Sequence, residues 1–152
     1  MGGKKSKFQR QIFSLIVLLS IEINSSSPEL SIKNHKTHFE NIAMTLWENA
    51  ELGYQEEKSS LLLSSTLEKE GFKISTGVAG IPTAFMAEYG SSGPVIGILG
   101  EFDALPGLAQ TTSPFREKAV NETGAGQACG HHLFGAGSAW AAVVIKEWLE
   151  SN

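Results

Sequence analysis

The pattern of apolar and polar positions predicts three helices in this chain. Apolar residues recur at helical spacing over residues 39–47, and Thr37 and Glu40 at the start of this stretch form a T-x-x-E capping box. A second helix is predicted over residues 56–70, where leucines recur four residues apart. Over residues 132–150 apolar side chains occur so broadly around the helix that little of it can face water, which predicts a largely buried third helix.

Three short stretches between the second and third helices have the β-branched and aromatic composition of strands. They are FKIST at 72–76, TAFMAEY at 83–89 and PVIGILGEF at 94–102, and glycine-containing turns separate them. The last two are predicted to pair as a hairpin across the GSSG turn at 90–93. The resulting order of elements predicts an α/β fold, with functional residues at strand ends and in the loops that follow them.

The first 35 residues differ from the rest of the chain. The segment MGGKKSKFQRQ is basic, and the apolar run IFSLIVLLSI that follows is far shorter than the ~20 residues that span a bilayer. Residues 1–21 therefore resemble a signal peptide, and residues 22–35 are predicted to be a polar linker around Pro28. We expect an exported protein, periplasmic or extracellular. Because no A-x-A cleavage site is evident, an uncleaved anchor or a cytoplasmic protein is the alternative.

Composition narrows the class of protein. The chain has 152 residues, of which 41% are hydrophobic and 18% charged, as expected for a soluble domain or part of one. The formal net charge of −4, without a basic block beyond the first ten residues, predicts no nucleic-acid partner. The single cysteine, Cys129, cannot form an internal disulfide, so it is a buried small residue, a reactive thiol or a metal ligand.

Two motifs carry candidate chemistry. Glu101 and Asp103 follow a predicted strand at a spacing of two, and Cys129 and His131 lie in the glycine-rich run GQACGHHLFGAG. Each motif has an ordinary interpretation, because acidic pairs often cap turns, single cysteines are often buried, and adjacent histidines are often exposed. Together, however, thiolate, imidazole and carboxylate form the set of ligands that zinc and manganese sites use.

Four blocks in collinear order resemble a known family of enzymes. ELGYQEEKSS, GVAGIPTAF, GILGEFDALPG and ACGHHLFGAGSAWAA resemble the metal-dependent amidohydrolase and carboxypeptidase family, which includes aminoacylases, hippurate hydrolases and auxin-conjugate hydrolases. Within it the chain is similar to the p-aminobenzoyl-glutamate hydrolase group and related dipeptidases. The resemblance implies that residues 36–152 form the N-terminal portion of a metallopeptidase catalytic domain, a mixed sheet flanked by helices, ending before the lid or dimerisation domain.

The resemblance also implies roles for individual residues. Cys129 and His131 match the C-G-H block and are implied to be ligands of a centre that holds two divalent ions, zinc or manganese. Asp103 matches the aspartate of the D-A-L-P block, which is implied to act in catalysis by orienting a ligand and tuning the metal-bound water. Glu101 falls where more distant relatives carry a histidine ligand, so no metal role is carried over to it.

Two positions depart from the pattern of the family. Gln127 stands where a histidine is usual, and His132 replaces the customary Asn or Asp. The first departure is expected to alter the surroundings of the ligands, and the second to add or distort a ligand. The family's Glu-Glu pair, which supplies the general base, and its later histidine ligands have no counterpart in these 152 residues. We therefore expect an N-terminal fragment of a longer reading frame, inactive by itself.

The activity implied for the whole protein is hydrolysis of the amide bond of N-acyl or aryl-acyl amino acids or small dipeptides by a metal-activated water. The implied partners are this small-molecule substrate and further protein chains, assembled as a homo- or hetero-oligomer through a domain beyond residue 152. One alternative is a cysteine amidase, in which His131 or His132 activates Cys129 and Asp103 orients the base. Another alternative is a non-catalytic binding or structural fragment.

Overall fold

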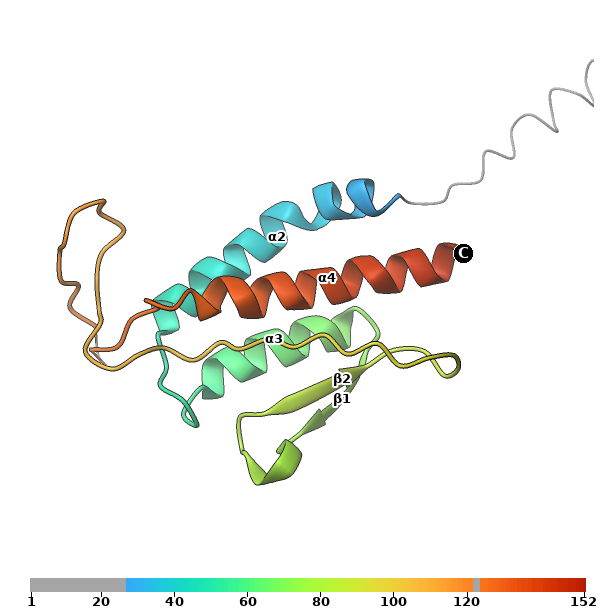
Figure 1. Cartoon of the computed structure of the whole chain (residues 1–152), viewed down its shortest axis with the longest axis horizontal. Helices are drawn as coiled ribbons and strands as arrows, with labels where there is room; N and C mark the ends of the chain where they lie inside the picture. Colours follow the sequence, from blue (N-terminus) through green and yellow to red (C-terminus); the bar gives the residue numbers. More distant parts are fainter. Residues whose placement is uncertain (1–26, 122–123) are drawn as a thin grey trace, which may run out of the picture.

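The computed structural model describes residues 27–121 and 124–152 (Figure 1). The predicted signal peptide therefore lies outside the described residues. The described elements, in chain order, are α2 (Pro28–Asn49), α3 (Glu57–Lys69), β1 (Lys73–Thr76), the 3-10 turn η1 (Val78–Gly80), β2 (Phe85–Glu88) and α4 (His131–Ser151). Among these helices, none combines the length and the apolar character needed to cross a bilayer.

The first described helix, α2, begins earlier than its apolar pattern predicts. It starts at Pro28 rather than near Thr37, because the Ser27 hydroxyl accepts a hydrogen bond from the Leu30 amide and proline suits the first helical position. The T-x-x-E box consequently lies inside the helix. The prediction of a linker extending to residue 35 is wrong for residues 28–35, which form the first turns of α2 and bury Ser31.

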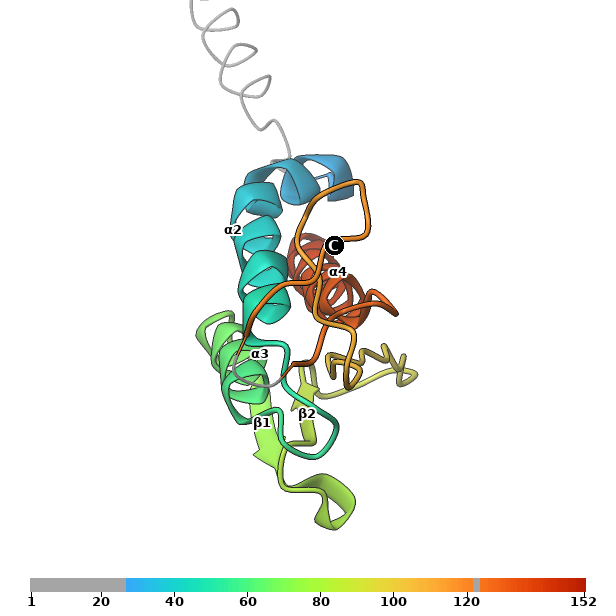
Figure 2. The same ribbon diagram turned by 90° about the vertical axis from the view of Figure 1, so that its left-hand side faces the viewer.

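The three helices form the body of the structure. In two perpendicular views α2 and α4 lie side by side, α3 packs against them, and the β1–β2 hairpin packs on α3 (Figures 1 and 2). Phe39 of α2 stacks on Trp140 of α4 with ring centroids 5.8 Å apart. Leu46, Leu63 and Val143, one from each helix, are almost completely buried in the same core. Burial of these apolar side chains is the main stabilising term for this bundle.

The strands pair differently from the prediction. β1 and β2 form an antiparallel pair, in which Lys73 lies opposite Glu88 and Thr76 opposite Phe85. The predicted hairpin between 83–89 and 94–102 is therefore wrong, since β2 pairs with the strand before it. Residues 94–102 lack strand pairing within the described part of the chain. The predicted mixed sheet is thus reduced here to a two-stranded antiparallel sheet, because the near-continuous apolar run at 94–102 needs neighbouring strands that these residues do not provide.

Candidate metal centre

The candidate site lies where the extended chain of residues 101–103 passes the first residue of α4. Two anchoring interactions hold the loops that surround it. The Ala104 amide donates to the Glu51 carbonyl at 2.7 Å, and Leu105 exchanges backbone hydrogen bonds with Gly126. A side chain at position 126 would place its Cβ 2.0 Å from the Leu108 carbonyl oxygen, so only glycine allows this close approach. The loop that carries Asp103 is thereby held against the loop that leads into α4.

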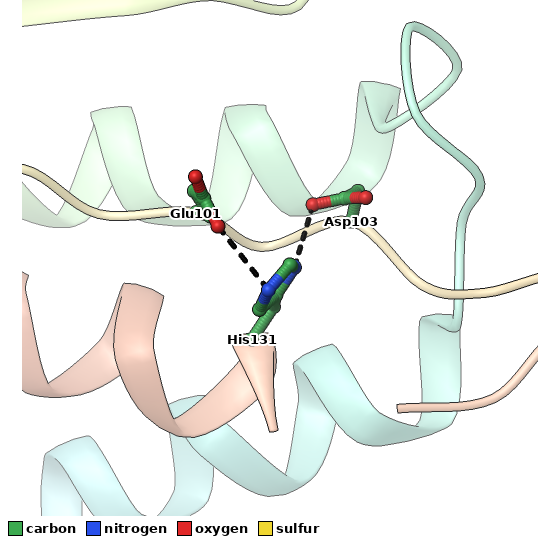
Figure 3. A group of neighbouring side chains, drawn as sticks. All are labelled: Glu101, Asp103 and His131. Carbon is green, nitrogen blue, oxygen red and sulfur yellow. Dashed lines mark hydrogen bonds and ion pairs between the residues drawn. The ribbon is translucent and has the colours of Figure 1, made fainter. Parts of the chain in front are cut away.

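The centre consists of one imidazole between two carboxylates (Figure 3). His131 Nδ1 lies 2.8 Å from Asp103 Oδ1, and His131 Nε2 lies 3.1 Å from Glu101 Oε2. The three residues each offer a ligand atom, and these atoms all lie within 4.8 Å of one another. The His131 side chain is largely buried and Glu101 is half-exposed, so the group opens to solvent on the Glu101 side. A carboxylate on one ring nitrogen orients a histidine so that the other nitrogen can bind a metal.

The structure brings two of the predicted site residues together. His131 and Asp103 are in direct contact, as expected if the aspartate orients the histidine. Cys129 is exposed in the turn just before α4 and is not a member of the group formed by Glu101, Asp103 and His131. Glu101, to which the family resemblance carried no metal role, is the group's third member. The spacing of two between Glu101 and Asp103 predicted that their carboxylates lie on the same side, because alternate residues of an extended chain point to the same side.

The two positions that depart from the family pattern lie behind the site. Gln127 is buried; its side-chain amide donates toward the carbonyls of Leu46 and Phe102, and its oxygen accepts from the backbone amide of His132. It therefore ties the end of α2 and the extended segment to the start of α4. The His132 ring is buried edge-on against Trp47, and this burial lowers its pKa, which favours the neutral ring. His132 is not a member of the group formed by Glu101, Asp103 and His131.

A further buried carboxylate lies near the site. Thr83 donates a 2.7 Å hydrogen bond to Glu56 Oε2, and both side chains are buried. A Cβ added to Gly53 would lie 3.8 Å from Asp103 Oδ2 and 3.9 Å from Glu56 Oε1. The ELGYQEE block thus passes beside Asp103 and leaves room around its second oxygen. The local sequence around Gly53 and Glu56 does not show that they lie beside the loop that carries Asp103, so neither residue was predicted as a neighbour of the site.

This group of side chains lies on a partial α/β frame, and the relatives of the chain are named as hydrolases, a deacetylase and carboxypeptidases. No family model matches the chain. The chain is homologous to part of a p-aminobenzoyl-glutamate hydrolase subunit from Escherichia coli (strain K12), with 38% identity over 120 residues, covering 79% of this chain and 25% of the relative. It is also similar to N-acetylcysteine deacetylase of Bacillus subtilis (strain 168), at 32% identity over 76% of this chain and 30% of the relative.

A further relative is the hippurate hydrolase of Campylobacter jejuni, at 33% identity over 61% of this chain and 24% of the relative. Thermostable carboxypeptidases of Saccharolobus solfataricus are similar over about the same share of the chain, so the homology is to amidohydrolases and carboxypeptidases, and it is distant and partial. The chain spans less than a third of the length of these curated relatives.

Proposed function

We propose that this chain is part of a metal-dependent hydrolase that cleaves the amide bond of N-acyl or aryl-acyl amino acids or of small dipeptides. The observation that supports it best is the His131 imidazole held by Asp103, with its second nitrogen facing Glu101. The homology to amidohydrolases supports the reaction class, and the names of the relatives support the substrate class, since hippurate and N-acetylcysteine are N-acyl amino acids.

The imidazole nitrogen and carboxylate oxygens of this group are donor atoms that divalent zinc and manganese ions bind. His131 would bind through Nε2 and Glu101 through a carboxylate oxygen, while Asp103 holds Nδ1 and keeps the ring in place. Cys129 is proposed as a further ligand from the C-G-H block. We propose zinc or manganese, two ions in the complete site. When bound, such ions lower the pKa of a water molecule and polarise the amide carbonyl.

The chain's own contribution is positioning. Asp103 restricts rotation of the His131 ring, and Gln127 fixes the backbone where α4 begins. The general base that the resemblance implies is a glutamate outside these residues, so the 152-residue chain is expected to lack hydrolase activity. Oligomerisation through a further domain is likewise proposed for the whole protein; the relative from Escherichia coli is named as a subunit.

The proposal is tested by metal binding to the chain itself. Isothermal titration calorimetry with zinc should show weak binding, because protein zinc sites use three or four ligands and this chain offers only part of such a set. His131→Ala should remove this binding. His38→Ala is the matched control, since His38 is exposed on α2 away from the group. Equal zinc binding by wild type and His131→Ala would contradict a metal centre at this position.

A second experiment separates the metal mechanism from the cysteine alternative. In a longer protein that contains this chain, hydrolysis of hippurate or N-acetylcysteine should stop on chelation and return with zinc or manganese. Cys129→Ser should abolish the activity and reduce the metal content measured by elemental analysis, because a neutral hydroxyl is a poorer ligand than a thiolate. Hydrolysis by a metal-free protein that still depends on Cys129 would instead show that the cysteine is a nucleophile.

A further inference from the structure

The side chain of Gln127 is buried between α2, the extended segment of residues 101–103 and the start of α4, and it is only 3% exposed. Its Nε2 lies 3.3 Å from the Leu46 carbonyl oxygen and 3.5 Å from the Phe102 carbonyl oxygen. Its Oε1 accepts a 3.2 Å hydrogen bond from the His132 amide. A carboxamide has two N–H donors and one acceptor oxygen. This side chain therefore uses all of these groups on the backbone of three different segments.

Two of these three backbone groups adjoin the residues of the candidate metal centre. Phe102 lies between Glu101 and Asp103 in the chain. His132 directly follows His131. The contacts of 2.8 Å and 3.1 Å between the imidazole and the two carboxylates depend on how the start of α4 lies against the extended segment. The buried carboxamide bonds to the backbone of both, so it holds the two parts of the centre in register.

The start of α4 depends on this contact, because the helix has no side-chain cap of its own. Its N-cap residue is Gly130, which adopts a left-handed conformation with φ 76° and has no side chain that could accept a hydrogen bond. An N-cap side chain ordinarily accepts from the second or third amide of the helix. The second amide of α4 belongs to His132, and Gln127 Oε1 accepts from it instead. The Gly130 amide donates to the Gln127 carbonyl at 2.9 Å, which closes the turn between these two residues.

We propose that Gln127 is a positioning residue of the metal centre, whose carboxamide holds the His131 ring between the two carboxylates and thereby sets the affinity of the centre for a divalent ion. This inference rests on the metal centre proposed above. The role needs a donor for the Phe102 carbonyl and an acceptor for the His132 amide on one side chain. Metal affinity responds to such positioning because a histidine that is not already held in place must be ordered when the ion binds.

The first test compares two substitutions by calorimetric titration of the full chain with zinc. Gln127→Met has a side chain of similar length with neither the donor nor the acceptor, and it should weaken zinc binding at least about tenfold, as the loss of a group that orients a ligand usually does. Gln127→His keeps one donor and one acceptor on a neutral ring, so its loss of affinity should be clearly smaller. Circular dichroism checks that both variants fold. If Gln127→Met does not fold, Gln127→Asn takes its place, because its carboxamide is one methylene too short to reach all three partners.

The control removes a buried polar group that lies away from the centre. Thr66 on α3 is 6% exposed, and its hydroxyl donates to the Leu62 carbonyl at 2.8 Å. Thr66→Val should lower the midpoint of thermal unfolding, because a buried hydrogen bond is lost, and it should leave the zinc affinity unchanged. This comparison separates an effect on the metal centre from a general loss of stability.

A second measurement follows the His131 ring in the absence of metal. A ring held against Asp103 should show a slowly exchanging Nδ1 proton in the proton NMR spectrum, which His131→Ala identifies by its loss. Gln127→Met should broaden or remove this signal, and Gln127→His should restore it. Thr66→Val should retain it, since a residue that only stabilises the fold does not change how the ring is held.

The outcomes distinguish this inference from the metal centre on which it rests. If wild type binds zinc, His131→Ala abolishes the binding and Gln127→Met binds as tightly as wild type, the centre stands and the role of Gln127 is refuted. If wild type binds no zinc, the centre is contradicted and the inference with it. Equal losses of affinity in Gln127→Met and Thr66→Val would also overturn the inference, because lower stability would then explain both. A loss in Gln127→His as large as in Gln127→Met would refute the role given to the donor and acceptor.

Discussion

At the scale of single residues, the contact between Asp103 and His131 is the feature most directly open to mutation. Asp103→Asn should preserve the fold, because the Asp103 side chain is at the protein surface and about a third exposed. It should weaken zinc binding by about 10- to 100-fold, the usual effect of removing a carboxylate that orients a ligand histidine. Calorimetric titration measures the affinity and thermal unfolding measures the stability. Glu40→Gln, which changes an exposed carboxylate on α2, is the control.

Unchanged zinc affinity in Asp103→Asn would mean that this carboxylate only shapes its turn. That outcome would support the ordinary interpretation of the acidic pair, as a turn or cap motif without metal chemistry.

The residues of the site were predictable to different degrees. The sequence indicated Asp103 and His131, because each belongs to a motif whose chemistry is visible locally. The spacing of Glu101 and Asp103 indicated that both carboxylates lie on one side of the chain, but not that His131 would lie between them, nor that Gln127 would join α2, the extended segment and α4 through its amide. These contacts link residues far apart in the chain, and no local pattern encodes them.

At the scale of elements, the early turns of α2 are fixed to the C-terminal half of α4 by one carboxylate. Glu147 accepts a hydrogen bond from the Ser31 hydroxyl, and its other oxygen lies 2.7 Å from His35 Nε2. Burial raises the pKa of Glu147, but hydrogen bonds from Ser31 and His35, with the charges of His35 and Lys146, lower it below the ordinary value of 4.5. The ionised carboxylate is therefore stabilised in the folded state.

Glu147→Gln should lower the free energy of unfolding at neutral pH by about 1 to 2 kcal/mol, because hydrogen bonds to a charged acceptor are replaced by weaker ones. The pKa of Glu147 is lower in the folded than in the unfolded chain. Its stabilisation is therefore complete above pH 4.5 and is lost as the pH falls through the folded-state pKa. Compared with Glu147→Gln, wild type should lose more stability over this acidic range in urea unfolding experiments.

Glu68→Gln, an exposed position on α3, controls for the loss of one negative charge. If wild type and Glu147→Gln lose stability in parallel on acidification, Glu147 does not fix α2 to α4 in the way described.

At the scale of the whole molecule, we propose that residues 1–21 direct export. Mature protein should begin between residues 22 and 27, because a start in this range removes the apolar run and keeps Ser27 to cap α2. N-terminal sequencing of the protein recovered from the periplasm or medium measures this directly. Soluble cytosolic protein that retains Met1 would contradict the proposal.

The sequence by itself determined the extent of α3, the start of α4 and the residues of two candidate motifs, but not the start of α2 or the burial of α4, where Leu133 and Leu149 are more than half exposed. α3 spans Glu57–Lys69 against a predicted 56–70, and α4 begins within one residue of its predicted start. Helical periodicity is readable because residues three and four apart share one face, a relation contained within a few turns. The start of α2 was missed because the polar residues around Pro28 were interpreted as a linker, whereas Ser27 and Pro28 form the N-terminus of the helix.

Only the tertiary structure decided the pairing of the strands and the completion of the site. Residues 83–89 were correctly predicted to contain a strand, but whether it pairs with the strand before or after it depends on contacts with α3 that the strand itself does not encode. Likewise, His131 meets Glu101 because α4 packs against the extended segment, where Gly135 leaves room for the backbone of residue 101. Local patterns specify elements, whereas the neighbours of each element follow from the packing of the whole chain.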